Sequence, residues 1–133
     1  MPLCAANKRE IELFKMILDF ISIIISTEQN LDFFRTIGFE ETDREVRPDN
    51  HDIVVWMKGN GMELKIFIDS THPSRVTNPE AYGLRHLSIS TTDIEKLHDS
   101  LKKYNPDPIK ETNNKRFFFV RDPDNCPFRF GEA

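Results

Sequence analysis

The side chains of this chain with the greatest capacity for chemistry are Lys65, His86 and Arg129. Lys and Arg offer hydrogen-bond donors and positive charge to an anion, and the planar Arg guanidinium suits two-pronged contact with a carboxylate or phosphate. His exchanges a proton near neutral pH. These three residues, together with Phe20, occupy equivalent positions of a sequence unit that is used twice.

The repeat is visible in two pairs of short segments. Residues 20–23 (FISI) return at 86–89 as HLSI, and residues 64–67 (LKIF) are matched at 128–131 by FRFG. Two copies of one unit tend to face each other across an approximate twofold, so that equivalent positions line a shared cavity. We therefore expect Phe20, Lys65, His86 and Arg129 to surround one cavity.

Length, composition and net charge limit the classes of protein to which this chain can belong. The chain has 133 residues, 38% of them hydrophobic, and a net charge of −4. That length predicts one globular domain, and the acidic balance argues against a nucleic-acid partner. Two isolated cysteines, Cys4 and Cys126, are no disulfide framework, so a reducing, cytoplasmic location is expected.

The N-terminal region gives no sign of a membrane segment. The most apolar run, residues 16–25, is interrupted by Asp19 and is too short to span a bilayer. No basic start followed by an apolar stretch is present, so a signal peptide is not expected. Residues 7–18 have apolar side chains at helical spacing, which predicts a helix in an N-terminal extension over 1–15.

Periodicity predicts the elements of the first copy. Alternating residues predict a strand over 19–25, and Ser26 with Gln29 resembles a capping box before a helix that Gly38 ends. Further strands are expected over 39–46, 52–57 and 62–68.

The second copy repeats this order after a proline-containing linker over 70–82. A strand is predicted over 84–90, a helix over 94–101 after a capping box of Thr92 and Glu95, and strands near Ile109 and over 116–121 and 128–130. The predicted fold class is α+β, with two β-α-β-β-β modules in a single domain over 16–132. The first module spans 16–69 and the second spans 83–132.

This order of elements, with three local segments, resembles the vicinal oxygen chelate superfamily, which includes glyoxalase I, bleomycin-resistance proteins and extradiol dioxygenases. The matching segments are 33–39 (FFRTIGF), 83–87 (GLRHL) and 116–124 (RFFFVRDPD), and 78–81 (NPEA) also matches. The chain looks most similar to small lactoylglutathione lyase-like members. The resemblance covers residues 16–132 and implies a cup of mixed β-sheet.

In metal-dependent members of that superfamily the cup holds a divalent ion on His, Glu, His and Glu. The resemblance places Phe20, Lys65, His86 and Arg129 at those positions, so only His86 is retained. Phe has no lone pair, and Lys and Arg offer only donors, so these residues predict no metal and no cofactor. A register slip of two residues would instead place Glu63 at the second position.

The expected ligand is a small organic molecule that is anionic or aromatic. Its binding residues would be Lys65 and Arg129, with contributions from Phe20, Ser22, Ser88 and Phe67. The alternative is that the protein neutralises the two cations itself, through Glu63, Glu132 or an acid from the linker.

Three further interpretations remain open. His86 could act as the catalytic base of a glyoxalase I-type lyase or isomerase, or could simply hydrogen-bond to a nearby serine. The N-terminal segment and the sheet edges could form a homodimer interface. Asp122 and Asp124 are assigned to turn formation, and Cys126 to a structural role.

Overall fold

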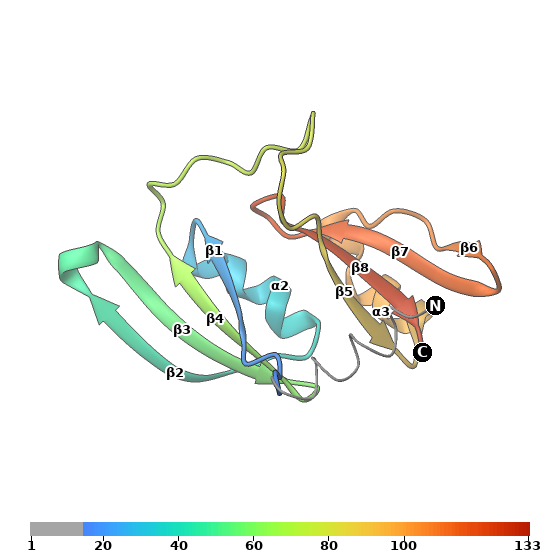
Figure 1. Ribbon diagram of the computed structural model, residues 1–133, viewed down its shortest axis with the longest axis horizontal. Helices are drawn as coiled ribbons and strands as arrows, with labels where there is room; N and C mark the ends of the chain where they lie inside the picture. The colour runs from blue at the N-terminus through green and yellow to red at the C-terminus, as the bar shows by residue number, and fades with distance from the viewer. Residues whose placement is uncertain (1–14) are drawn as a thin grey trace, which may run out of the picture.

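The computed structural model describes residues 15–133 and shows two four-stranded mixed sheets with two short helices (Figure 1). The strand orders are β1-β4-β3-β2 and β5-β8-β7-β6, so both sheets have the same topology. In each sheet the first strand pairs in parallel with the last, and the other neighbours are antiparallel. The predicted α+β class and the repeated β-α-β-β-β order are confirmed.

The first sheet and its helices come from the first copy of the repeat. The elements are β1 (Ile21–Ile25), η1 (Glu28–Asn30), α2 (Leu31–Thr36), β2 (Glu40–Arg47), η2 (Pro48–Asn50), β3 (Asp52–Gly59) and β4 (Met62–Ile68).

The second sheet follows a long loop that contains no strand or helix and runs outside both sheets (Figure 1). The elements are β5 (Leu87–Thr91), α3 (Ile94–Ser100), η3 (Lys102–Tyr104), β6 (Lys110–Thr112), β7 (Lys115–Arg121) and β8 (Pro127–Glu132).

Strand alternation divides each sheet into a core face and a face that is open to solvent. In β1, Ile23 and Ile25 are buried, whereas Ser22 and Ile24 are exposed. In β4 the buried positions are Leu64, Ile66 and Ile68, which leaves Lys65 and Phe67 on the other face. The β-branched, alternating sequence thus determines which side chains remain available to a ligand.

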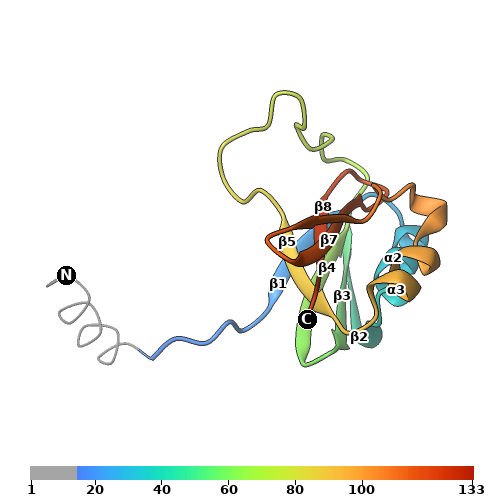
Figure 2. The ribbon, with the colours of Figure 1, turned by 90° about the vertical axis from the view of Figure 1, so that its right-hand side faces the viewer.

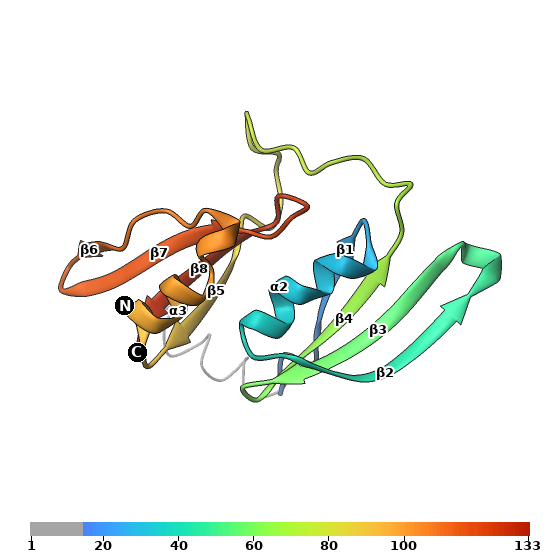
Figure 3. The same cartoon turned by 180° about the vertical axis from the view of Figure 1, so that it is seen from behind.

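Helices α2 and α3 lie next to each other on the core side of the two sheets (Figures 2 and 3). Phe33 in α2 is fully buried, and its ring centroid lies 5.1 Å from that of Phe128 in β8 and 5.0 Å from that of Tyr104. One hydrophobic cluster therefore extends through both modules. The modules cannot turn relative to each other without disrupting it.

Both predicted capping boxes are wrong. The N-cap of η1 is Thr27, which makes no side-chain capping bond. The hydroxyl of Ser26 instead accepts from the Asn30 side chain, and the backbone N–H of Ser26 donates to Asp124 in the second module. The N-cap of α3 is Asp93, whose side chain accepts from the backbone N–H of Lys96. In the first case a tertiary contact overrides the local signal, and in the second the true cap lies one residue later.

The helix predicted over 7–18 falls mostly outside the described residues. Residues 15–20 form neither helix nor strand. Within the part of the chain that the structure describes, no helix is long and apolar enough to cross a membrane.

Candidate functional site

The strand register places Lys65 and Arg129 at equivalent positions of the two sheets. Lys65 in β4 pairs with Ser22 in β1, and Arg129 in β8 pairs with Ser88 in β5. On its other side Lys65 pairs with Trp56, which corresponds to the pairing of Arg129 with a phenylalanine of β7. The two basic residues thus stand on the same face of the same strand in each copy.

In the first module the ammonium group of Lys65 is surrounded by aromatic rings. Its Nζ lies 5.1 Å from the ring centroid of Trp56, 5.2 Å from that of Phe67 and 5.8 Å from that of Phe20. The rings of Phe20 and Trp56 meet edge to face at 5.0 Å and 80°. We call these four residues the first cluster.

The second module repeats this arrangement with other residues. The rings of His86 and Phe119 meet edge to face at 5.2 Å and 81°, as Phe20 and Trp56 do in the first cluster. The guanidinium carbon of Arg129 lies 4.7 Å from the ring centroid of Phe117, and Nη1 of Arg129 donates to the Ser88 hydroxyl at 3.2 Å. These five residues form the second cluster.

One of the rings that contact the cation comes from a different strand in each cluster. In the first sheet Phe67 of β4 faces Val54 of β3, whereas in the second sheet Phe117 of β7 faces Gly131 of β8. A Cβ atom on Gly131 would come within 3.0 Å of Nη1 of Arg129. Gly131 therefore leaves the space in which the guanidinium lies over Phe117.

Within the described residues, no carboxylate neutralises the two cations. Among residues 15–133, no carboxylate oxygen lies within 4.0 Å of the charged nitrogens of Lys65 or Arg129. Glu132 instead pairs with Arg116, which also contacts Glu95. Aromatic rings and one hydroxyl take the place of the acids that the sequence offered as partners.

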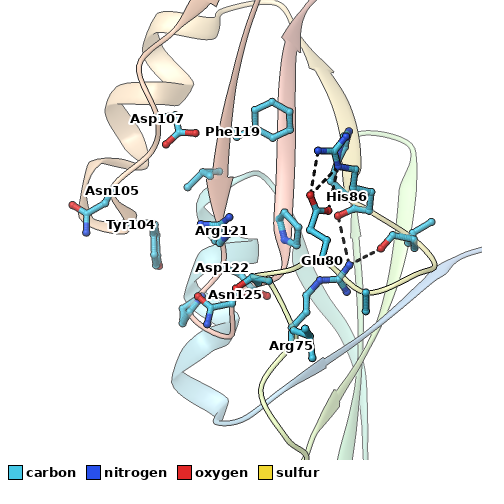
Figure 4. Close-up of a pocket in the computed structure, with 18 of the residues that line it drawn as sticks. Arg75, Glu80, His86, Tyr104, Asn105, Asp107, Phe119, Arg121, Asp122 and Asn125 are labelled. Atoms are coloured by element: carbon cyan, nitrogen blue, oxygen red, sulfur yellow. Dashed lines mark hydrogen bonds and ion pairs between the residues drawn. The ribbon is translucent and has the colours of Figure 1, made fainter.

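A pocket of about 880 Å³ lies at one end of the second sheet (Figure 4). Its walls are the long loop before β5, the end of η3 with the loop after it, the last residues of β7 and the turn between β7 and β8. Of the residues predicted for the site, His86 is the one that lines it, and Phe119 of the second cluster lines it too. Lys65 and Arg129 lie elsewhere on the open faces of the sheets.

The turn that closes this pocket is organised by Asp122, which is 3% exposed. Its Oδ1 accepts hydrogen bonds from the backbone N–H groups of Asp124 and Cys126. Burial raises the pKa of Asp122 to about 6, because these two hydrogen bonds only partly offset the loss of solvation. The assignment of Asp122 and Asp124 to turn chemistry agrees with this geometry.

Cys126 lies in the same turn and is half-buried. Burial, and secondarily the charge of Asp122, raise the pKa of its thiol to about 11. A thiol with so high a pKa is a poor nucleophile at neutral pH, in keeping with a structural residue.

Comparison with known proteins shows the family to which this chain belongs. Residues 20–130 match the family model of the Glyoxalase/Bleomycin resistance protein/Dioxygenase superfamily. The chain belongs to this superfamily. The resemblance deduced from local segments is therefore confirmed, and superfamily members bind small molecules.

Individual relatives agree with this assignment. The chain is 30% identical over 119 residues to the uncharacterized protein YwkD of Bacillus subtilis, covering 84% of this chain and 93% of YwkD. A glyoxalase family protein from Enterococcus faecalis is 31% identical, with a TM-score of 0.78, over 90% of this chain and 99% of that one. The fosfomycin resistance protein FosX from Listeria monocytogenes, at 15% identity and a TM-score of 0.70 over 90% and 95%, shares the fold.

The superfamily resemblance assigns the metal positions to Phe20, Lys65, His86 and Arg129. Of these residues only His86 offers a lone pair to a divalent ion, because Phe has none and Lys and Arg act only as donors. Glu63 faces Lys58 of β3, as Pro127 of β8 faces Arg121 of β7, so the register makes Lys65, and not Glu63, the equivalent of Arg129. Within the described residues no three His, Cys, Asp or Glu side chains are grouped to hold an ion.

His86 makes no hydrogen bond to Ser22, Ser88 or Ser90, the serines that sequence reasoning offered as partners. Its contact is with the Phe119 ring instead. The residues that this reasoning passed over are those of the pocket, above all Arg121, which shares a face of β7 with Phe117 and Phe119. Alternation along 117–121 was the available signal.

Proposed function

We propose that this protein is a metal-independent binding member of the glyoxalase and bleomycin-resistance superfamily whose ligand is a small organic anion with a flat, aromatic body. The observation that carries the proposal is that Lys65 and Arg129, each half-buried, lie on aromatic rings without an acidic partner in residues 15–133. Half-buried cations of this kind gain most from an anion that arrives from outside.

The contacts of the two cations leave donors free for a ligand. A cation over an aromatic face is held by the ring quadrupole, which uses none of its N–H groups in hydrogen bonds. Within the described part of the chain Lys65 makes no side-chain hydrogen bond, and Arg129 uses one nitrogen to bind Ser88. The remaining N–H groups can donate to a carboxylate or phosphate.

The rings of the two clusters supply the second half of the recognition. Trp56 and Phe119 are the direct strand neighbours of Lys65 and Arg129, and both are only partly buried. A planar ligand could stack on them while its anionic group meets the cation, which adds apolar burial to the ionic contact. Phe20, Ser22, Ser88 and Phe67 complete the proposed set.

Benzoate is a suitable probe, because it combines one carboxylate with one ring. We expect isothermal titration to show benzoate binding that is unchanged by EDTA and is weakened about tenfold or more by Arg129→Gln or Lys65→Gln, because each removes a charge-assisted contact. Lys96→Gln, the same charge change at an exposed residue of α3, is the control. Binding that requires zinc, nickel or manganese, or that ignores both substitutions, would refute the proposal.

The second candidate function is that of a glyoxalase I-type lyase or isomerase. It is favoured by the position of His86 in the wall of the 880 Å³ pocket, where its ring could exchange a proton with a bound substrate. Turnover of a hemithioacetal that is lost in His86→Ala would support this function. Equal turnover, or none in either protein, would rule out His86 as its base.

The proposal also includes assembly as a homodimer in the cytoplasm. Several large apolar side chains are exposed in the segment before β1 and in the loop before β5, among them Ile17 at 93% and Leu84 at 77%. A second copy could cover them. Light scattering that gives the mass of a single chain would exclude the dimer.

A further inference from the structure

The open face of the second sheet continues past Arg129 toward the pocket. Alternate residues of β7 place Phe117, Phe119 and Arg121 on this face, and Arg121 pairs with Pro127 while Phe119 pairs with Arg129. Arg121 and Arg129 are therefore diagonal neighbours on adjacent antiparallel strands. Their Cα atoms are about 7–8 Å apart in such an arrangement.

Arg121 resembles Arg129 in having no acidic partner in the part of the chain that the structure describes. Its side chain is exposed, lines the pocket and makes no ion pair or side-chain hydrogen bond with any residue of 15–133 (Figure 4). Three acids also line the pocket. Glu80 is held by Arg85, Asp122 is buried in its turn, and Asp107 has no contact with Arg121 within 4.0 Å.

The surface between the two guanidinium groups is aromatic. Phe119 lies between Arg121 and Phe117 on β7, next to Arg129, and its ring meets that of His86 edge to face. Phe119 and His86 both line the pocket (Figure 4). One face thus presents a cation, a flat apolar patch and a second cation in a row.

We propose that the ligand is a diacid, with one anionic group on Arg129 and Ser88 and the other on Arg121 inside the pocket. The proposal rests on the anion-binding function inferred above and specifies its ligand class. One dianion neutralises both guanidinium groups while losing its translational and rotational freedom once, whereas two separate monoanions would each lose theirs. A rigid aromatic spacer between the two anionic groups could lie on Phe119, which stands between Arg121 and Phe117 on β7.

The loop before β5 would enclose the second anionic group. Arg75 donates to the backbone carbonyl of Leu84, and Arg85 pairs with Glu80, so the loop is held in its fold by its own contacts. Thr77 and Glu80 form a bridge within the same loop. A diacid bound at Arg121 would therefore meet this loop as one wall of the pocket.

The experiment compares benzoate with terephthalate, which adds a second carboxylate across the same ring. We expect terephthalate to bind the unmodified protein about tenfold more tightly than benzoate. Arg121→Gln should remove this advantage and leave benzoate affinity unchanged, because the single carboxylate of benzoate does not reach Arg121. Lys96→Gln, at an exposed residue of α3, again serves as the matched charge control.

The outcomes separate this proposal from the one on which it rests. Equal affinity for the two acids, or a terephthalate advantage that persists in Arg121→Gln, would overturn the diacid while benzoate binding at Arg129 stands. Loss of one bound terephthalate per chain in Arg121→Gln would also overturn it, because Arg121 and Arg129 would then each have their own ligand. If neither acid binds, the proposed function itself fails.

Discussion

At the scale of single residues, the proposed site is defined by the two basic side chains at positions where the superfamily resemblance implies metal ligands. Lys65 and Arg129 stand at equivalent positions and both rest on aromatic rings, although the rings come from different strands in the two copies. The position equivalent to Phe67 is Gly131 in the second copy, and the position equivalent to Phe117 is Val54 in the first. Each cation nevertheless has a ring beside it. Both copies thus place a cation over an aromatic ring, although the cation and the strand that supplies the ring differ between them.

Substitution of Gly131 tests whether the position of Arg129 over the Phe117 ring matters for binding. In Gly131→Ala the new Cβ would lie 3.0 Å from Nη1 of Arg129, so the guanidinium must shift by a few tenths of an ångström relative to the Phe117 ring. Because the clash falls on the end of a flexible side chain, we expect the free energy of unfolding to change by less than about 1 kcal/mol, while benzoate affinity falls several-fold. Chemical denaturation and calorimetric titration measure the two quantities. Unchanged affinity would mean that the position of Arg129 over Phe117 is irrelevant to binding.

The residues of the site could be named from the sequence because the repeat aligns them. Matching 64–67 with 128–131 identified Lys65 and Arg129, and alternation placed them on the open face. Their neighbours were harder to assign, because Trp56 and Phe119 become partners of the cations only through strand pairing. The sequence suggested acids as partners, and it could not show that Glu132 would be held by Arg116.

At the scale of elements, the turn between β7 and β8 is the most constrained segment of the second module. Asp122 binds two backbone N–H groups within it, and Asp124 reaches across to the backbone of Ser26 and the side chain of Asn30. This long-range contact explains why the helix start after β1 was misassigned. Serine is a common capping residue, but the backbone N–H of Ser26 binds Asp124 of the second module and its hydroxyl accepts from Asn30.

The raised pKa of Asp122 predicts a pH dependence of stability. Because burial raises this pKa from 3.8 to about 6, the stability contributed by the protonated carboxyl is full below about pH 3.8 and is lost as pH rises through about 6. Nearby Asp124 also raises the pKa, and Arg75 lowers it. From about pH 7.5 to about pH 4.5, the unmodified protein should gain about 2 kcal/mol of unfolding free energy relative to Asp122→Asn.

The measurement is urea denaturation of both proteins at each pH, since the variant cancels the titration of all other groups. Asn keeps an oxygen that can accept from the backbone of Asp124 and Cys126, so the turn should persist. A difference between the two proteins that does not change with pH would show that Asp122 titrates as an ordinary carboxyl. A difference that changes in the opposite direction would show that the two backbone hydrogen bonds outweigh burial.

At the scale of the whole molecule, the open faces are oriented by the packing of one module on the other. Phe33 of the first module contacts Phe128 and Tyr104 of the second, and Asp124 of the second binds Asn30 of the first. The repeat predicted that two copies would face a shared cavity. The sequence did not show how they pack, because this packing depends on aromatic contacts between residues far apart in the chain.

Replacement of Phe33 tests whether the two modules are one cooperative unit. The side chain is fully buried between them, so Phe33→Ala should lower the free energy of unfolding by about 3–5 kcal/mol. Because the core is shared, the loss should appear in a single transition recorded by both the Trp56 fluorescence of the first module and the circular dichroism of the whole chain. Tyr82→Ala, at a fully exposed ring of the loop before β5, should change stability by less than about 0.5 kcal/mol. Two separate transitions in Phe33→Ala, with fluorescence lost before circular dichroism, would show that each module folds on its own and that their shared core does not fix the orientation of Lys65 relative to Arg129.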